Sequence, residues 1–125
     1  MIKKKILLTF ALLIVSGLTN AGWLLITDDS KGKFYVENLA IKRQNELREF
    51  WGIQNLARPN KMIKSGKAFH RVDCTNRVIE VLYMSVHTEI FAEGIRLQEF
   101  QKPNINFTPS EQPELAPVID FVCSQ

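Results

Sequence analysis

Two cysteines and two histidines carry the most distinctive chemistry in this sequence. Cys74 and Cys123 could form a disulfide, bind a metal or supply a nucleophile. A metal would need further ligands, and His70 and His87 are the only histidines. If the chain turns around Asn76, neither histidine approaches a cysteine. The pattern therefore favours a structural disulfide over a metal site or a nucleophile.

Ser85 and His87 come closest to a catalytic pair. Two positions apart on a strand, they would share one face of a sheet, but no third member is evident. Paired carboxylates are not evident, and the few glycines lack the spacing of a phosphate-binding loop. The sequence predicts a protein that is not an enzyme and that needs no cofactor or metal.

Five basic residues form the strongest candidate for binding. Most fall within a predicted loop at residues 57–67, and the set is Arg58, Lys61, Lys64, Lys67 and Arg71. Such a cluster could hold an acidic protein patch or a polyanion such as heparin. The alternative, which we favour, is a solvated loop whose charges serve solubility, which is the usual role of exposed lysine.

Four aromatic residues could form a second binding face. They are Trp23, Trp51, Tyr35 and Tyr83. The alternative, which we favour, is that they belong to the core and to cross-strand packing of a small β-domain.

The N-terminal residues have the pattern of an export signal. Three lysines at positions 3–5 precede an apolar stretch at 6–15 and a run of small residues at 16–22. This is the layout of a secretory signal peptide, with cleavage expected after Ala21 or, second, after Gly22. The apolar stretch is short for a membrane anchor, which needs roughly 20 residues. Residues 1–21 are therefore predicted to be a bacterial signal peptide, which leaves no transmembrane segment in the mature chain.

Removal of this segment changes the charge balance. The whole sequence has 16 basic and 13 acidic residues, and three of the basic ones lie at positions 3–5. The mature chain is thus formally neutral, so nothing points to a nucleic-acid partner. Residues 22–125 suffice for one small domain, which an oxidising compartment would allow a disulfide to stabilise.

The residue pattern predicts a small antiparallel sheet followed by a helix. Strands are expected at residues 22–27, 33–36, 46–56 and 105–108, and a central hairpin at 69–87 places His70 opposite Leu82. Residues 42–45 are expected to be a turn, and Pro59 and Pro103 are expected to end or break strands. An apolar stripe between Leu115 and Val122 predicts a helix that begins near Gln112 or near Ala116.

The ordered set of these stretches resembles the surface-adhesin protein E family of exported bacterial proteins. The carriers of the resemblance are residues 23–26, 34–37, 50–56, 72–74, 81–83, Gly94, 107–110 and 122–123. The resemblance implies an α+β fold of about five to six antiparallel strands packed by a C-terminal helix. It also implies a disulfide that joins this helix to the sheet.

The family name implies adhesion to host extracellular-matrix or serum proteins. The expected location is the periplasm or the cell surface. The alternative function is a periplasmic helper or inhibitor domain without an adhesive role.

Overall fold

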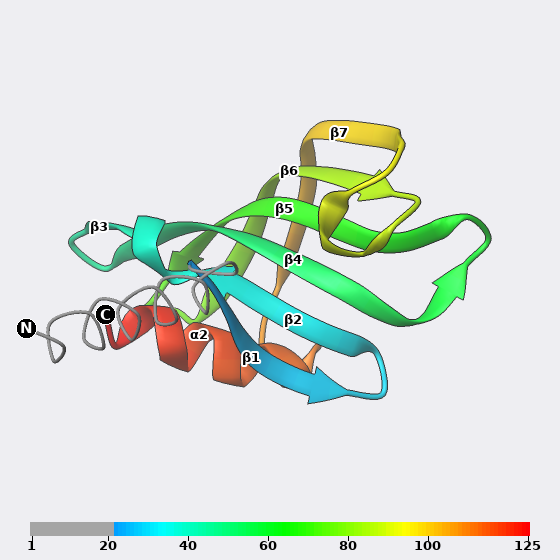
Figure 1. Cartoon of the computed structure of the whole chain (residues 1–125). Coiled ribbons are helices and arrows are strands. Elements are labelled where there is room, and N and C mark those ends of the chain that lie inside the picture. The colour runs from blue at the N-terminus through cyan, green and yellow to red at the C-terminus, as the bar shows by residue number, and fades with distance from the viewer. Residues whose placement is uncertain (1–21) are drawn as a thin grey trace, which may run out of the picture.

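The computed structural model of this protein describes residues 22–125. The predicted signal peptide, residues 1–21, lies outside the described residues. The described part is one twisted antiparallel sheet with a helix against one face (Figure 1).

Seven strands form the sheet, so the prediction of five to six was too low. Neighbouring strands run in the order β1-β2-β4-β5-β6-β7, and β3 pairs with β4 beside β2. Every pairing is antiparallel, as predicted. The strands are β1 (Trp23–Asp29), β2 (Gly32–Glu37), β3 (Lys42–Gln44), β4 (Leu47–Asn60), β5 (Ile63–Asp73), β6 (Val78–His87) and β7 (Arg96–Phe107).

Strand β3 was missed because its three residues are all polar. Lys42, Arg43 and Gln44 pair with the start of β4 and are exposed, so they lack the apolar alternation that indicates a strand. A short 3-10 helix, Asn38–Ala40, precedes it.

The predicted loop at residues 57–67 is wrong. β4 continues through Pro59 to Asn60, and β5 begins at Ile63, so this stretch is the end of a long hairpin. The ladder is interrupted between Asn55 and Asn60. Because no ladder bond is needed there, the missing N–H of Pro59 leaves no gap. The turn residue Lys61 adopts a left-handed conformation with φ 59°.

The central hairpin is confirmed. The carboxylate of Asp73 accepts hydrogen bonds from the backbone N–H groups of Thr75 and Asn76, at 3.0 and 3.1 Å, which fixes the turn. The register differs by one position from the expectation: His70 pairs with Val81 and not with Leu82, because a bulge interrupts the ladder next to Phe69.

Strand β7 runs through Pro103, where the sequence predicts a break. The β6 ladder skips from Gln101 to Ile105, and both Lys102 and Asn104 have positive φ. This bulge lies on an edge strand, where proline costs no ladder hydrogen bond. The strand predicted at residues 105–108 is therefore the end of one longer, bulged strand.

The C-terminal helix begins at Ala116, the second of its two predicted starts. A 3-10 turn, Pro113–Leu115, leads into helix α2, Ala116–Cys123. Its predicted apolar stripe is confirmed, because Val118, Ile119 and Val122 are fully buried. They pack against the sheet residues Val36, Phe50, Val72 and Ile79 to form the core.

A disulfide joins helix α2 to the sheet, as predicted. Cys74, directly after β5, bonds to Cys123, and their Cα atoms are 5.8 Å apart. Arg48 Nε donates to the Val122 carbonyl at 3.1 Å, and Arg77 forms an ion pair with Asp120 at 2.8 Å. The helix is thus attached to the sheet by covalent, polar and apolar contacts.

The first turn depends on a glycine. Gly32 has φ 131°, and an added Cβ would collide with the carbonyl oxygen of Asn55 and lie 2.8 Å from the amide nitrogen of Ala57. Both are backbone atoms, so relief requires β2 to move from β4. We expect Gly32→Ala to lower the free energy of unfolding by about 2 kcal/mol. Urea unfolding measures this, and Gly66→Ala is the control because its Cβ would meet only Ser85 O, at 3.6 Å. Equal stability of the two variants would contradict the expectation.

Candidate binding face

The sheet face that α2 leaves open carries a row of aromatic side chains. Trp51 on β4, Phe69 on β5 and Tyr83 on β6 are direct partners in neighbouring ladders. The Trp51 ring centroid lies 5.0 Å from that of Phe69 and 5.8 Å from that of Tyr83. All three side chains are half-buried. We call these three residues and Trp23 the aromatic row.

The predicted cross-strand packing of the aromatic residues is confirmed, but their predicted place in the core is wrong. The buried core lies under α2, and none of the tryptophans or tyrosines belongs to it. Side chains alternate between the two faces of a strand, so Phe50 enters the core and Trp51 points the opposite way. The alternative that the sequence left second, an aromatic binding face, is therefore available to this fold.

The side chain of Lys67 lies over two rings of the aromatic row. Its Nζ lies 5.0 Å from the Trp51 ring centroid and 6.0 Å from that of Trp23. A cation above an aromatic face is attracted by the negative charge density of the ring. Lys67 forms no ion pair with any of residues 22–125. Its charge therefore stays available to a ligand.

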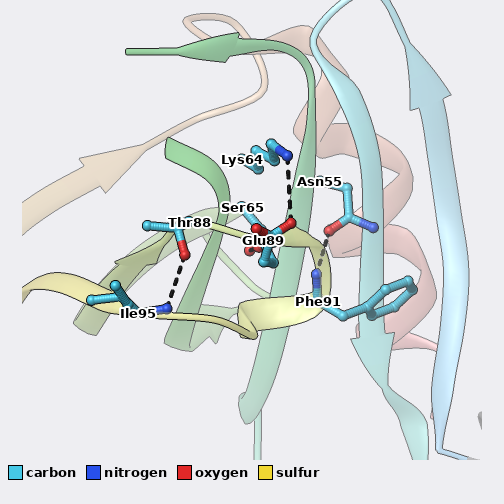
Figure 2. A network of polar contacts seen from close by, with 7 residues as sticks. All are labelled: Asn55, Lys64, Ser65, Thr88, Glu89, Phe91 and Ile95. Atoms are coloured by element: carbon cyan, nitrogen blue, oxygen red, sulfur yellow. Dashed lines mark hydrogen bonds and ion pairs between the residues drawn. The ribbon is translucent and has the colours of Figure 1, made fainter. Parts of the chain in front are cut away.

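The loop between β6 and β7 folds back over the same face of the sheet (Figure 2). The backbone N–H of Phe91 donates to Asn55 Oδ1 at 2.8 Å. Ser65 Oγ donates to the Glu89 carbonyl at 2.6 Å and accepts from the Ala92 N–H at 2.9 Å. Side chains of β4 and β5 therefore fix the position of the loop on the sheet.

Two loop residues have unfavourable backbone conformations. Phe91 and Ala92 have φ values of 57° and 58°, in the left-handed region that residues other than glycine rarely adopt. The hydrogen bonds that the two backbone N–H groups donate to Asn55 and Ser65 stabilise this conformation. It places the Phe91 ring 4.7 Å from the Tyr35 ring, centroid to centroid, and covers that end of the face.

A hollow of about 230 Å³ lies between this loop and the aromatic row. Its lining residues come from β4, β5, β6, the loop and the start of β7, and include Trp51, Lys67, Tyr83, Ser85, His87 and Arg96. Tyr83 donates its hydroxyl to Glu99 at 2.5 Å, and Glu99 also pairs with Arg96 at 3.2 Å. The hollow therefore combines aromatic, cationic and hydroxyl groups.

Ser85 and His87 share this face, as predicted. Ser85 Oγ and His87 Nε2 are 2.8 Å apart, and both residues are buried. Burial lowers the pKa of His87, and the positive charges of Arg96 and Lys67 lower it further. Within residues 22–125 no carboxylate bonds to the ring. The pair thus offers a neutral hydrogen-bonding group and lacks the acid that orients a catalytic histidine.

Comparison with known proteins identifies the family. The model of the family described as surface-adhesin protein E matches residues 23–124. The chain belongs to this family. The resemblance inferred from the sequence is thereby confirmed.

Solved structures show the same fold as this adhesin E family member. The structure of Haemophilus influenzae protein E matches with a TM-score of 0.61 at 16% identity, covering 83% of this chain and 85% of that chain. The crystal structure of protein E from non-typeable Haemophilus influenzae matches with a TM-score of 0.59 at 13% identity, covering 83% and 76%. The search of curated proteins finds no match for this family member.

The five basic residues of this adhesin E family member do not form one cluster. Arg58 and Lys61 are exposed near the tip of the β4–β5 hairpin. Lys64 pairs with Glu89 at 3.4 Å. Arg71 pairs with Glu49 at 2.9 Å and with Glu80 at 3.9 Å, and Lys67 lies on the aromatic row. As candidate binding residues they fall into a hairpin-tip group and a sheet-face group.

Sequence reasoning missed Phe69, Arg96 and the role of Lys67. Phe69 and Lys67 could have been found from the alternation of side chains along a strand. Lys67, Phe69 and Arg71 are two positions apart, so they share one face and alternate with residues of the helix-covered face. Arg96 had no such signal, since its position depends on the folded-back loop.

A second cavity, also of about 230 Å³, lies between the sheet and the turn before α2. His70 lines it and is only 6% exposed. Its ring stacks on Phe50 with centroids 4.9 Å apart, and its Nδ1 has no hydrogen-bond partner. Burial lowers the pKa of His70 to about 4, although the nearby Phe50 backbone favours the protonated ring. The ring is therefore neutral at pH 7.

Two further features bear on metals and membranes. Across the part of the chain that the structure describes, no three His, Cys, Asp or Glu residues converge as metal ligands would. Over the same residues, no helix has both the length and the apolar character needed to cross a membrane.

Proposed function

We propose that this protein is an exported surface adhesin that holds host extracellular-matrix or serum proteins on its open sheet face. The observation that carries the proposal is the aromatic row, which is half-buried and which lies on the sheet face that helix α2 leaves open. Tryptophan and tyrosine are enriched among the residues that dominate the energetics of protein interfaces, and they bury large area at a small cost in side-chain entropy. Membership in the surface-adhesin protein E family supports the same function.

The rest of the proposal concerns export and contact residues. Residues 1–21 are proposed as the signal peptide and 22–125 as the single mature domain, located in the periplasm or at the cell surface. We assign the protein a binding role and no catalysis. Of the basic residues, Arg58 and Lys61 would meet an acidic partner at the hairpin tip, and Lys67 would meet it on the sheet face.

The location decides between adhesion and the periplasmic helper or inhibitor role. Protease shaving of intact cells, followed by immunoblotting, should remove this chain while a periplasmic marker survives. Full protection of the chain would contradict the adhesin proposal, because an adhesin must be reachable from outside.

A variant pair tests the binding face. We expect Trp23→Ala to weaken binding of the purified protein to immobilised matrix proteins at least tenfold, because it removes one end of the aromatic row. Surface plasmon resonance measures this. Leu24→Ala is the control, since Leu24 is an apolar side chain, 41% exposed, that follows Trp23 in β1 and therefore points to the opposite face of the sheet. An equal effect of both variants would exclude the sheet face as the contact surface.

A further inference from the structure

We propose that the hollow between the aromatic row and the β6–β7 loop binds a sugar unit that carries a carboxylate. This inference rests on the proposed function, since it names the chemical class that the adhesin face would hold on a host glycoprotein. The site consists of Trp51, Lys67, Tyr83, Ser85 and His87, with Arg96 at its edge.

The charge of the ligand follows from Lys67. Its neighbours on β5, Lys64 and Arg71, are each paired with a glutamate, whereas Lys67 has no such partner among residues 22–125. Its ammonium group is held against two tryptophan rings that cannot neutralise it. Arg96, at the edge of the hollow, is paired with Glu99 at 3.2 Å, so among residues 22–125 the unpaired positive charge that lines the hollow is that of Lys67. A single carboxylate complements this site.

The size and walls of the hollow favour a sugar ring. A cavity of about 150 Å³ accommodates benzene, so the 230 Å³ here can hold a six-membered ring with substituents. The C–H groups on the face of a pyranose are weakly positive and pack well on the negative faces of aromatic rings such as Trp51 and Tyr83. A folded peptide segment would be too large for the hollow itself.

Hydroxyl recognition comes from the buried pair. Ser85 Oγ and the neutral His87 ring can exchange their mutual hydrogen bond for bonds to sugar hydroxyls. A ligand without hydroxyls would leave the Ser85–His87 hydrogen bond as it is and would gain no bond from this pair. This favours a sugar over an aliphatic acid of the same charge.

The unfavourable loop conformation supports a functional hollow. Ala92 lines it, and the left-handed backbone at Phe91 and Ala92 is maintained by the hydrogen bonds that their N–H groups donate to Asn55 and Ser65. Backbone outliers that surrounding residues hold in place are concentrated at binding sites. The acids Glu99 and Glu49 lie nearby on the same face. They disfavour a long polyanion, which would bring many negative charges onto this face.

Binding of single sugars tests the proposal directly. Residues 22–125 with the disulfide intact are titrated with N-acetylneuraminic acid, with glucuronic acid and with N-acetylglucosamine, and the indole N–H signals of Trp23 and Trp51 are followed by NMR. We expect at least one acidic sugar to bind saturably, with a dissociation constant on the order of 1 mM. The uncharged sugar should bind at least tenfold more weakly, and added salt should weaken the acidic one. The acid that binds more tightly identifies the source as a sialylated or a uronic-acid glycan.

Matched variants locate the site. Lys67→Met should weaken binding of the acidic sugar at least tenfold, and Lys67→Arg should restore part of it. Lys61→Met removes the same charge at the hairpin tip and should change nothing. Unshifted indole signals with both acids, or equal binding by Lys67→Met and the unchanged protein, would overturn the proposal. Adhesion to matrix proteins that persisted in either case would leave the proposed function intact and locate its contacts elsewhere on the face.

Discussion

Removing the disulfide, by Cys74→Ala together with Cys123→Ala, is expected to lower the free energy of unfolding by about 4 kcal/mol. The two cysteines are 49 positions apart, and opening a closed loop of about that length restores the corresponding chain entropy to the unfolded state. The loss is a large share of the roughly 5–15 kcal/mol that stabilises a whole domain. Replacing both cysteines avoids a free thiol. Urea unfolding in non-reducing buffer measures the change.

The consequence should be concentrated at the C-terminus. Helix α2 has only eight residues, too few to persist without tertiary contacts. It supplies Val118, Ile119 and Val122 to the core, so its detachment would expose the apolar sheet face beneath it. The remaining links, from Arg48 and Arg77, are partly or fully solvent-exposed and contribute little alone. The control is Ser124→Ala, which leaves the disulfide in place; an unchanged stability of the double cysteine variant would contradict the expectation.

The local pattern predicted most elements because their chemistry is local. The hairpin at residues 69–87 has alternating side chains and a turn that Asp73 fixes, and α2 has a clear apolar stripe. The two misjudged prolines show what local pattern lacks. Pro59 and Pro103 are harmless because the ladder is interrupted at each, and an interruption depends on partner strands that lie far away in sequence.

The candidate site was only partly predictable for the same reason. Basic spacing along the chain suggested one cluster, but strand pairing separates the charges, and Glu49 on β4 and Glu89 in the folded-back loop each pair with one of them. Lys67 became a candidate binding residue because its ammonium group lies over Trp23 and Trp51, which are on other strands. The hollow needs the folded-back loop, whose position depends on Asn55 and Ser65.

Stability should fall as the pH is lowered through the histidine range, and His70 should be the main cause. Its pKa is about 4 in the folded protein, compared with 6.5 for an ordinary histidine. Between these pH values the histidine is protonated in the unfolded chain but not in the folded chain. The contribution of His70 to the free energy of unfolding is therefore fully present above about pH 6.5 and is lost as the pH falls toward 4. The expected loss is about 2 kcal/mol between pH 7 and pH 5, and about 3 kcal/mol over the full range.

Measurement between pH 7 and pH 5 separates the protonation of His70 from the protonation of carboxylates. Asp73 and Glu114 have pKa values lowered below 3.8 and 4.5, so they remain largely charged there, both folded and unfolded. His70→Phe keeps an aromatic ring against Phe50 and should abolish most of the pH dependence of urea unfolding. His87→Gln is the matched control, because it removes the other histidine with a lowered pKa and leaves His70 in place. If the pH dependence disappears in His87→Gln and persists in His70→Phe, the buried ring beneath α2 is not the group that destabilises the fold on protonation.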